Sequence, residues 1–341
     1  MIRVLVAEDS AVAREYLVHL LSQDPALQVV GTALNGLDAV EQAERLRPNV
    51  VLMDVHMPHM NGYEATRQIM ERVPTPIVMV SSVLSHDEVV MTFEALKAGA
   101  LAVLDKPAGL GHPDSAKTAL QLRQTVKLMA GIKVIHRWPR RNRTDPPPVP
   151  PFGLPSAIRL VAIGASTGGP MVLAEILGDL PQNLSVPILV VQHIAPGFTA
   201  GLAEWIGRGS ALRVKLAEPG ETAHPGTVYV APHGSEMGIT KGMRIHLTQG
   251  AAENDFCPSI SYLFQSAAES IGRAAAGILL TGMGEDGANG LLELRRTGGV
   301  TIAQDEDTSV IFGMPGEAVR IGAAQYVLSP RQISGLLRGL V

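Results

Sequence analysis

A serine stands in a short glycine-rich turn near the middle of the chain, within Val161–Leu177, VAIGASTGGPMVLAEIL. Such a turn can hold a phosphate group at a helix N-terminus, or it can present a nucleophilic serine. Gly164–Gly168 fits G-x-S-x-G, whose small residues permit the tight strand-to-helix turn that exposes Ser166. A dinucleotide loop needs glycine where Ser166 stands, and a Walker loop needs Gly-Lys-Ser/Thr. The turn therefore favours acyl-transfer chemistry, although five residues alone are a weak signal.

A serine becomes a nucleophile only with a base, and the base needs a group that orients it. The next apolar run, VPILVVQHIAPG, ends at His193, and a third one, AAAGILLTGMGEDGANG, leads into a glycine-rich loop with Asp286. Each of the three polar residues follows a predicted strand, so we expect them at one edge of a sheet. The alternatives are a structural histidine at a strand end, and an aspartate that N-caps the helix following it.

A second set of polar residues follows predicted strands in the first third of the chain. Glu8 and Asp9 follow the first strand, Asp54 ends the third, Ser81 ends the fourth and Lys106 follows the fifth. Carboxylates that converge repel one another unless a hard cation neutralises them, and Mg²⁺ suits such a set. A lysine opposite them can pair with an incoming phosphoryl group. Alternatively, each acid is a separate, solvated surface residue. That is the better interpretation for any single acid, but not for a whole set of polar residues at matching strand ends.

Two series of strands alternating with helices must position these residues. The strands expected in the first series are Arg3–Ala7, Gln28–Ala33, Val50–Met53, Ile77–Val80 and Ala102–Leu104, and the helices include Ala11–Leu21, Leu37–Leu46 and Val89–Ala98. The strands expected in the second are Arg159–Gly164, Ile188–Gln192, Val228–Ala231, Gly277–Thr281 and Val300–Ala303, with helices over Met171–Gly178, Thr199–Ile206, Ile260–Ile271 and Gly287–Arg296. This alternation predicts an α/β protein with two doubly wound parallel sheets.

Composition bounds the organisation and the partners. At 341 residues the chain is long enough for two domains, and with 46% hydrophobic and 18% charged residues it is typical of a globular protein. A stretch rich in proline and arginine, IHRWPRRNRTDPPPVPPFGLP, predicts a linker over residues 131–157 between domains at 1–130 and 158–341. A net charge of -4 argues against a nucleic-acid partner, and one cysteine excludes an internal disulfide. With no signal peptide and no apolar run long enough to span a bilayer, we expect a cytoplasmic protein without membrane insertion.

The acidic set, with VAEDS, VVLMDVHMPHMNG, VMVSS and VLDKP, resembles the receiver domain of two-component response regulators over roughly residues 1–130. The resemblance implies a flavodoxin-like fold in which Asp54 accepts a phosphoryl group from a histidine kinase. It also implies that Glu8, Asp9 and Asp54 hold Mg²⁺, that Lys106 contacts the phosphoryl group, and that Ser81 supplies the switch hydroxyl. Ser82 is the alternative for that last role. His56 and His59, in the loop after Asp54, are interpreted as surface residues rather than metal ligands.

The serine turn, VVQHIAPGF and LLTGMGEDGANG, behind a receiver and a proline-rich linker, resemble the chemotaxis-type protein-glutamate methylesterases. The likeness covers about residues 159–340 and implies a Rossmann-like catalytic domain without a cofactor of its own. By this resemblance Ser166 is the nucleophile, His193 the general base and acid, and Asp286 the orienter of the imidazole, with an oxyanion hole near Met283. The implied reaction hydrolyses glutamate γ-methyl esters on chemoreceptors, releasing methanol, and extends to glutamine deamidation. Phosphorylation of the receiver is expected to relieve a block of the catalytic face.

The sequence departs from the usual family pattern at three places. Val103 stands where receivers usually carry an aromatic residue, and CPSISYLF places Cys257 and Ser261 where relatives usually carry a charged pair. We expect Cys257 and Ser261, like the loop APHGSEMGI, near the rim of the site. Two other functions stay open on the sequence alone: a catalytically silent adaptor that binds receptors under phosphorylation control, and nucleotide binding at the serine turn.

Overall fold

A computed structural model describes residues 1–341 except 82–85, 110, 133, 135–153, 155–156 and 250–256. It divides into two compact units, Met1–Asn142 and Arg143–Val341. Most of the linker predicted over residues 131–157, and the alternative switch residue Ser82, lie outside the described residues. Each unit is described by itself below.

The first unit is a five-stranded parallel sheet in the order β2-β1-β3-β4-β5. Its strands are β1 (Ile2–Ala7), β2 (Leu27–Ala33), β3 (Val50–Asp54), β4 (Ile77–Ser81) and β5 (Ala102–Asp105). Its helices are α1 (Ala11–Ser22), α2 (Gly36–Leu46), α3 (Gly62–Arg72), α4 (His86–Ala98) and α5 (Ser115–Ala130). The chain turns from β1 to β2 on one side and returns to β3 on the other, so the carboxyl ends of β1 and β3 form the topological switch point where such sheets bind ligands.

Local sequence explains the helix starts that flank this edge. Asn35 precedes α2 and accepts a hydrogen bond from the Asp38 N–H, and Asn61 precedes α3 and accepts one from the Glu64 N–H. Both are N-caps that satisfy backbone donors left without partners in the first helical turn. The strands are rich in valine, leucine and isoleucine, and β3 and β4 are buried along their whole length, as expected when helices cover both faces of a parallel sheet.

The second unit is built on a seven-stranded parallel sheet in the order β14-β13-β12-β6-β7-β9-β8. Its strands are β6 (Leu160–Ala165), β7 (Ile188–Gln192), β8 (Arg213–Leu216), β9 (Thr227–Val230), β12 (Ala275–Leu279), β13 (Val300–Gln304) and β14 (Tyr326–Leu328). Its helices are α6 (Gly169–Gly178), α7 (Phe198–Gly209), α8 (Ile260–Ser270), the short η1 (Gly272–Ala274), α9 (Ala288–Arg296), α10 (Met314–Arg320) and α11 (Pro330–Leu337).

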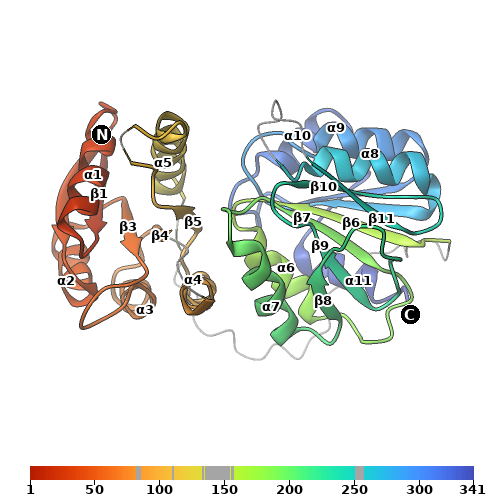
Figure 1. Cartoon of the computed structure of the whole chain (residues 1–341), viewed down its shortest axis with the longest axis horizontal. Helices are drawn as coiled ribbons and strands as arrows, with labels where there is room; N and C mark the ends of the chain where they lie inside the picture. The colour runs from red at the N-terminus through yellow and green to blue at the C-terminus, as the bar shows by residue number, and fades with distance from the viewer. Residues whose placement is uncertain (82–85, 110, 133, 135–153, 155–156, 250–256) are drawn as a thin grey trace. The chain divides into compact units, whose positions relative to one another are not determined.

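Helices lie on both faces of this second sheet. Figure 1 shows α8, α9 and α10 on one face and α6, α7 and α11 on the other. The first group encloses a buried cluster that includes Phe264 and Leu291, and an antiparallel hairpin, β10 (Ser235–Ile239) with β11 (Ile245–Gln249), packs against α8. The switch point of this sheet lies between β6 and β12, because the chain runs from β6 through β7 to β9 before it returns to β12.

The fold predicted from the sequence, two doubly wound parallel α/β domains, is confirmed. The predicted strands lie within two residues of the observed ones. The hairpin and the short elements β8, β14, α10 and α11 are not predicted from the sequence, because their runs of three to eight residues carry little periodicity. Among the described residues, no helix combines the length and the apolarity that crossing a bilayer requires.

Candidate active site and phosphoryl-acceptor site

The first unit gathers the predicted acidic residues at its switch point. Glu8 and Asp9 follow β1, Asp54 ends β3, and one carboxylate oxygen of each lies within 4.8 Å of the others. The Lys106 ammonium, which follows β5, stands 2.8 Å from Glu8 Oε2 and 2.9 Å from Asp54 Oδ2. The residues that the sequence places at separate strand ends therefore come together in one cluster.

Burial and charge determine which ion this cluster of side chains can bind. Glu8 and Asp54 are almost fully buried, and burial raises the pKa of both carboxyl groups. The Lys106 ammonium opposes that effect by donating to Asp54 and attracting Glu8. Three carboxylate oxygens at this spacing are hard donors of the kind that Mg²⁺ takes together with waters and phosphate oxygens. The donor set thus fits a magnesium ion beside the buried carboxylate of Asp54.

Ser81 ends β4 at this edge of the sheet, whereas Val103 lies farther back in β5, where it pairs with Met79. Ser81 is buried at the end of β4, where its carbonyl oxygen accepts the Lys106 N–H at 3.1 Å. Val103 is half-buried in β5. Within the described part of the chain, Glu8, Asp9 and Asp54 form the group with metal-ligand spacing, and His56 and His59 are not in it.

The serine turn of the second unit is shaped by its glycines. The Ser166 carbonyl oxygen accepts the Gly169 N–H at 2.8 Å, and Gly168 has φ 80° and ψ -12°. These are the marks of a type II turn, whose third residue needs a positive φ. A Cβ at Gly168 would also lie 2.6 Å from Val310 Cγ2. The turn ends β6 and starts α6, so Ser166 stands where a strand gives way to a helix N-terminus.

His193 and Ser166 leave neighbouring strands at the same level. Strands β6 and β7 pair in register as far as Ala165 and Gln192, and the His193 N–H donates to the Ala165 carbonyl at 2.9 Å. The next residue on each strand is therefore Ser166 or His193. The Ser166 N–H donates to the Thr281 carbonyl on the other side, in the segment that follows β12.

Asp286 completes the arrangement. Its Oδ2 lies 3.1 Å from His193 Nε2, and both side chains are nearly buried. Burial alone raises the pKa of Asp286, but hydrogen bonds from His193 and from the start of α8 outweigh it and hold that pKa well below its usual range. Asp286 is therefore ionised at neutral pH and can fix the orientation of the imidazole.

The structure corrects the alternative interpretation of Asp286 as the N-cap of the helix that follows it. That N-cap position is Gly287, with φ 91°. Asp286 instead caps α8, because its carboxylate accepts the N–H groups of Ile260 at 2.7 Å and Ser261 at 3.0 Å. It also accepts the hydroxyl of Ser259, the N-cap of α8, at 3.1 Å. One aspartate thus meets a histidine and the positive end of a helix some 26 residues earlier in the chain.

Comparisons with known proteins identify the family of both units. The CheB methylesterase family matches residues 161–337, and the response regulator receiver domain family matches residues 4–113. A protein-glutamate methylesterase/protein-glutamine glutaminase of Syntrophus aciditrophicus is 48% identical over 99% of this chain and 97% of its own length. One of Geobacter metallireducens is 49% identical over 100% of this chain and 99% of its own length. This chain belongs to the same family.

A solved structure supports the assignment of the second unit. The CheB methylesterase catalytic domain of Thermotoga maritima is 40% identical, covers 54% of this chain and 99% of its own, and has a TM-score of 0.52. The resemblance identified in the sequence is therefore confirmed. The protein is a hydrolase and a response regulator, with a receiver followed by a methylesterase unit.

The segment after β12 is hydrogen-bonded to the serine turn. Thr281 is fully buried, and its hydroxyl donates to the carbonyl oxygens of Thr167 and Ile311. It therefore ties the serine turn to the loop that carries Met283, whose side chain is partly exposed. Sequence reasoning did not select Thr281, although a threonine at the end of an apolar strand was the signal that could have found it.

Cys257 and Ser261, which we expect near the rim of the site, lie ahead of α8 and in its first turn. The Ser261 N–H donates to Asp286 Oδ1 at 3.0 Å, and the Ser261 hydroxyl accepts the Gly287 N–H at 2.8 Å. Cys257 is half-buried just ahead of α8. Part of the loop APHGSEMGI also reaches this region, since the buried Glu236 accepts the Ser259 N–H at 2.7 Å.

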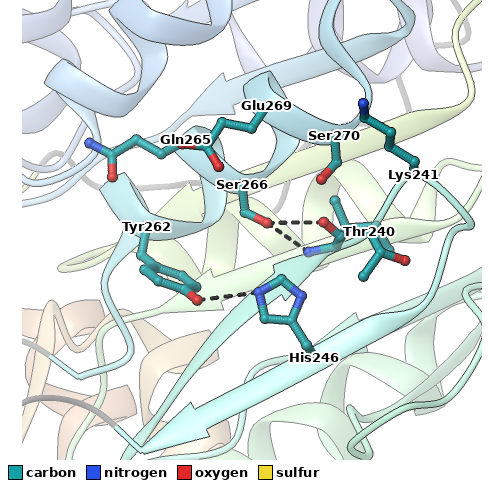
Figure 2. Close-up of a pocket in the computed structure, with 9 residues that line it drawn as sticks. Thr240, Lys241, His246, Tyr262, Gln265, Ser266, Glu269 and Ser270 are labelled. Carbon is teal, nitrogen blue, oxygen red and sulfur yellow. Dashed lines mark hydrogen bonds between the residues drawn. The ribbon is translucent and has the colours of Figure 1, made fainter.

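A separate hollow lies farther along α8. Figure 2 shows it between α8 and the β10–β11 hairpin. The volume of this hollow is about 250 Å³. His246 and Tyr262 face each other in it, with His246 Nε2 and the Tyr262 hydroxyl 3.2 Å apart. None of the three residues of the candidate triad lines it.

Proposed function

We propose that the methylesterase unit hydrolyses γ-methyl esters of glutamate on chemoreceptors, with Ser166 as nucleophile, His193 as general base and acid, and Asp286 as the orienting carboxylate. The observation that carries the proposal is the buried His193–Asp286 pair, 3.1 Å apart, at the strand end next to the serine turn. A carboxylate held ionised against an imidazole is the arrangement that prepares a base for a serine.

The pairing selects the catalytic nitrogen. Because Asp286 Oδ2 faces Nε2, the imidazole carries its proton on Nε2 and Nδ1 is the basic nitrogen. His193 Nδ1 takes the Ser166 hydroxyl proton as the serine oxygen attacks the ester carbonyl. Backbone N–H groups of the Met283 loop stabilise the oxyanion. The imidazolium then protonates the departing methoxide, which leaves as methanol, and an acyl-serine remains.

Hydrolysis of the acyl-serine completes the cycle. His193 takes a proton from water, the hydroxide attacks the acyl carbon, and the protonated imidazole returns the proton to Ser166 as the glutamate carboxylate leaves. A receptor glutamine enters the same cycle with ammonia as the leaving group, which accounts for glutaminase activity in one site. The cycle uses side chains and water and requires no cofactor in this unit.

The receiver supplies the control. We propose that Asp54 accepts a phosphoryl group from a chemotaxis-type histidine kinase, that Glu8, Asp9 and Asp54 hold Mg²⁺, and that Lys106 contacts the phosphoryl oxygens. Bound Mg²⁺ would neutralise negative charge beside the acceptor. Lys106, which now bridges Glu8 and Asp54, can turn to the added phosphoryl charge, and Ser81 supplies the switch hydroxyl. Phosphorylation then raises the esterase rate by favouring the active arrangement.

The proposal is tested by methanol release from membranes that contain methylated chemoreceptors. Ser166→Ala is expected to reduce release to the background. Ser210→Ala is the matched control, because the Ser210 hydroxyl donates to the Leu177 carbonyl at the other end of α6. Equal rates for wild type and Ser166→Ala would refute the serine mechanism. Receptor binding without methanol release by the wild type would favour the silent adaptor instead.

A further inference from the structure

A buried glutamine joins the main chains of the two residues proposed to act as nucleophile and base. Gln192 is the last residue of β7 and is 3% exposed. Its side-chain nitrogen donates to the carbonyl oxygen of Ser166 at 2.8 Å and to that of His193, also at 2.8 Å. One amide group thus connects the ends of two neighbouring strands just where the proposed catalytic side chains begin.

The orientation of this amide is fixed by its neighbours. Both contacts are carbonyl oxygens, which only accept hydrogen bonds, so the nitrogen and not the oxygen must face them. The amide oxygen points to α6, where a Cβ at position 169 would lie 2.2 Å from it. Gly169 therefore leaves room for the glutamine, and its own N–H donates to the same Ser166 carbonyl. The turn and the glutamine hold one oxygen from two sides.

The rest of β7 argues that this glutamine does more than fill space. Ile188–Val191 are apolar and fully buried, and Gln192 Oε1 has no hydrogen-bond partner among the described residues. An apolar side chain here would avoid burying an unpaired oxygen, which is costly. The glutamine links the main chains of residues 166 and 193. A nucleophilic serine and its base must be held at a fixed distance from each other, and this link can hold them there.

We infer that Gln192 is a positioning residue that sets the separation of Ser166 and His193 in the hydrolytic reaction. The inference rests on the proposed function, because Gln192 acts through Ser166 and His193 and has no assigned contact with the substrate. It predicts that loss of the amide lowers the rate of the chemical step while substrate binding is kept.

The test compares three variants in the full-length chain by methanol release from methylated receptor membranes. Gln192→Met keeps an unbranched side chain of similar length and removes both donors. Gln332→Met is the matched control, because Gln332 also uses its side chain to hold backbone, in the capping box of α11, where its Oε1 accepts the Ser329 N–H. Ser166→Ala reports on the proposed function itself. Circular dichroism verifies that each variant is folded at the assay temperature, and Gln192→Leu, which also removes both donors, replaces Gln192→Met if that variant does not fold.

Gln192→Met is expected to lower kcat about 10- to 100-fold with KM within about twofold, as misplacement of reacting groups does. The rate of inactivation by a serine-directed phosphonate should fall by the same factor, whereas Gln332→Met should match wild type in both. A kcat within about twofold of wild type for the folded Gln192 variant, with Ser166→Ala inactive, overturns this inference alone. An active Ser166→Ala overturns the proposed function instead.

Discussion

Replacing Asp286 by asparagine separates its two structural duties. The carboxylate accepts hydrogen bonds at Oδ1 from Ser259, Ser261 and Gly287, and at Oδ2 from Ile260, beside His193 Nε2. An asparagine that keeps its oxygen at the Oδ1 position preserves the first three contacts. Its NH₂ group then faces the Ile260 N–H and His193. We therefore expect Asp286→Asn to leave one buried backbone donor without an acceptor and to reverse the imidazole tautomer.

The magnitudes follow from those two losses. A hydrogen bond to a charged group contributes about 1.5–3 kcal/mol, and a buried donor left unpaired adds to the cost, so the free energy of unfolding should fall by about 2–4 kcal/mol. With the asparagine NH₂ donating to Nε2, the imidazole proton moves to Nδ1, which can no longer accept the serine proton. The rate should fall about 10²- to 10⁴-fold, as when the orienting carboxylate of a serine triad is neutralised.

The stability that Asp286 contributes should depend on pH. The pKa of Asp286 is lowered in the folded chain, so its stabilising effect is present above the unfolded pKa of about 3.9 and is lost as the pH falls below that value. Wild type and Asp286→Asn should therefore differ most in urea unfolding near neutral pH and converge in acid.

The matched control is Ser259→Ala. Ser259 donates to Asp286 Oδ1, not to the Oδ2 that faces His193, and caps α8 by accepting the Tyr262 N–H. Its loss should reduce the free energy of unfolding by about 1 kcal/mol and leave methanol release within about threefold of wild type. If folded Asp286→Asn hydrolyses ester as fast as Ser259→Ala, then Asp286 is only a helix cap and the reasoning is refuted.

Three further predictions concern the receiver and the serine turn. Acetyl phosphate with Mg²⁺ should raise methanol release by the wild type but not by Asp54→Asn, and EDTA should abolish the rise; activation of Asp54→Asn would exclude Asp54 as the acceptor. Gly168→Ala should lower the free energy of unfolding by about 1–3 kcal/mol and lower kcat, because φ 80° is strained for alanine and its Cβ would clash with Val310. Adding Val310→Ala to the same chain should recover only part of the lost stability, and full recovery would show that the turn tolerates alanine. Burial raises the pKa of Asp105 to about 6, so stability falls as pH rises from about 4 through 6, and Asp105→Asn should stabilise the receiver by about 1–2 kcal/mol above pH 7 but not at pH 4. Hydrogen-exchange protection factors of β5 in wild type and Asp105→Asn measure this difference. A variant that is protected as well as wild type both at pH 4 and above pH 7 would contradict the prediction.

Much of the fold could be predicted because each domain repeats one simple pattern. Buried parallel strands such as Val50–Asp54 are continuous apolar runs, and each is followed by a turn and an amphipathic helix. The carboxyl ends of such strands share one edge of the sheet, so the sequence alone predicts that Asp54, Lys106 and Glu8 lie close together. The β10–β11 hairpin could not be predicted in this way, because its strands contain polar residues and glycine and lie outside the parallel sheet.

The fine structure of the site could not be predicted in the same way. Proximity in sequence suggested that Asp286 caps the helix just after it, whereas the folded chain brings the start of α8 to it from some 26 residues away. Gln192 was visible as a polar residue at the end of an apolar run, but its two acceptors depend on the register of β6 with β7. Hydrogen bonds between segments distant in sequence are a property of the packed structure, so sequence periodicity does not report them.

The central claim is that Ser166 is the nucleophile, and covalent labelling tests it most directly. The wild-type chain is treated with a serine-directed phosphonate, digested and mapped by mass spectrometry while methanol release is followed on the same sample. We expect one adduct, on the peptide that contains Ser166, with activity lost in proportion to labelling. An adduct on another serine that accompanies the loss of activity, or full activity in a chain labelled at Ser166, would contradict it.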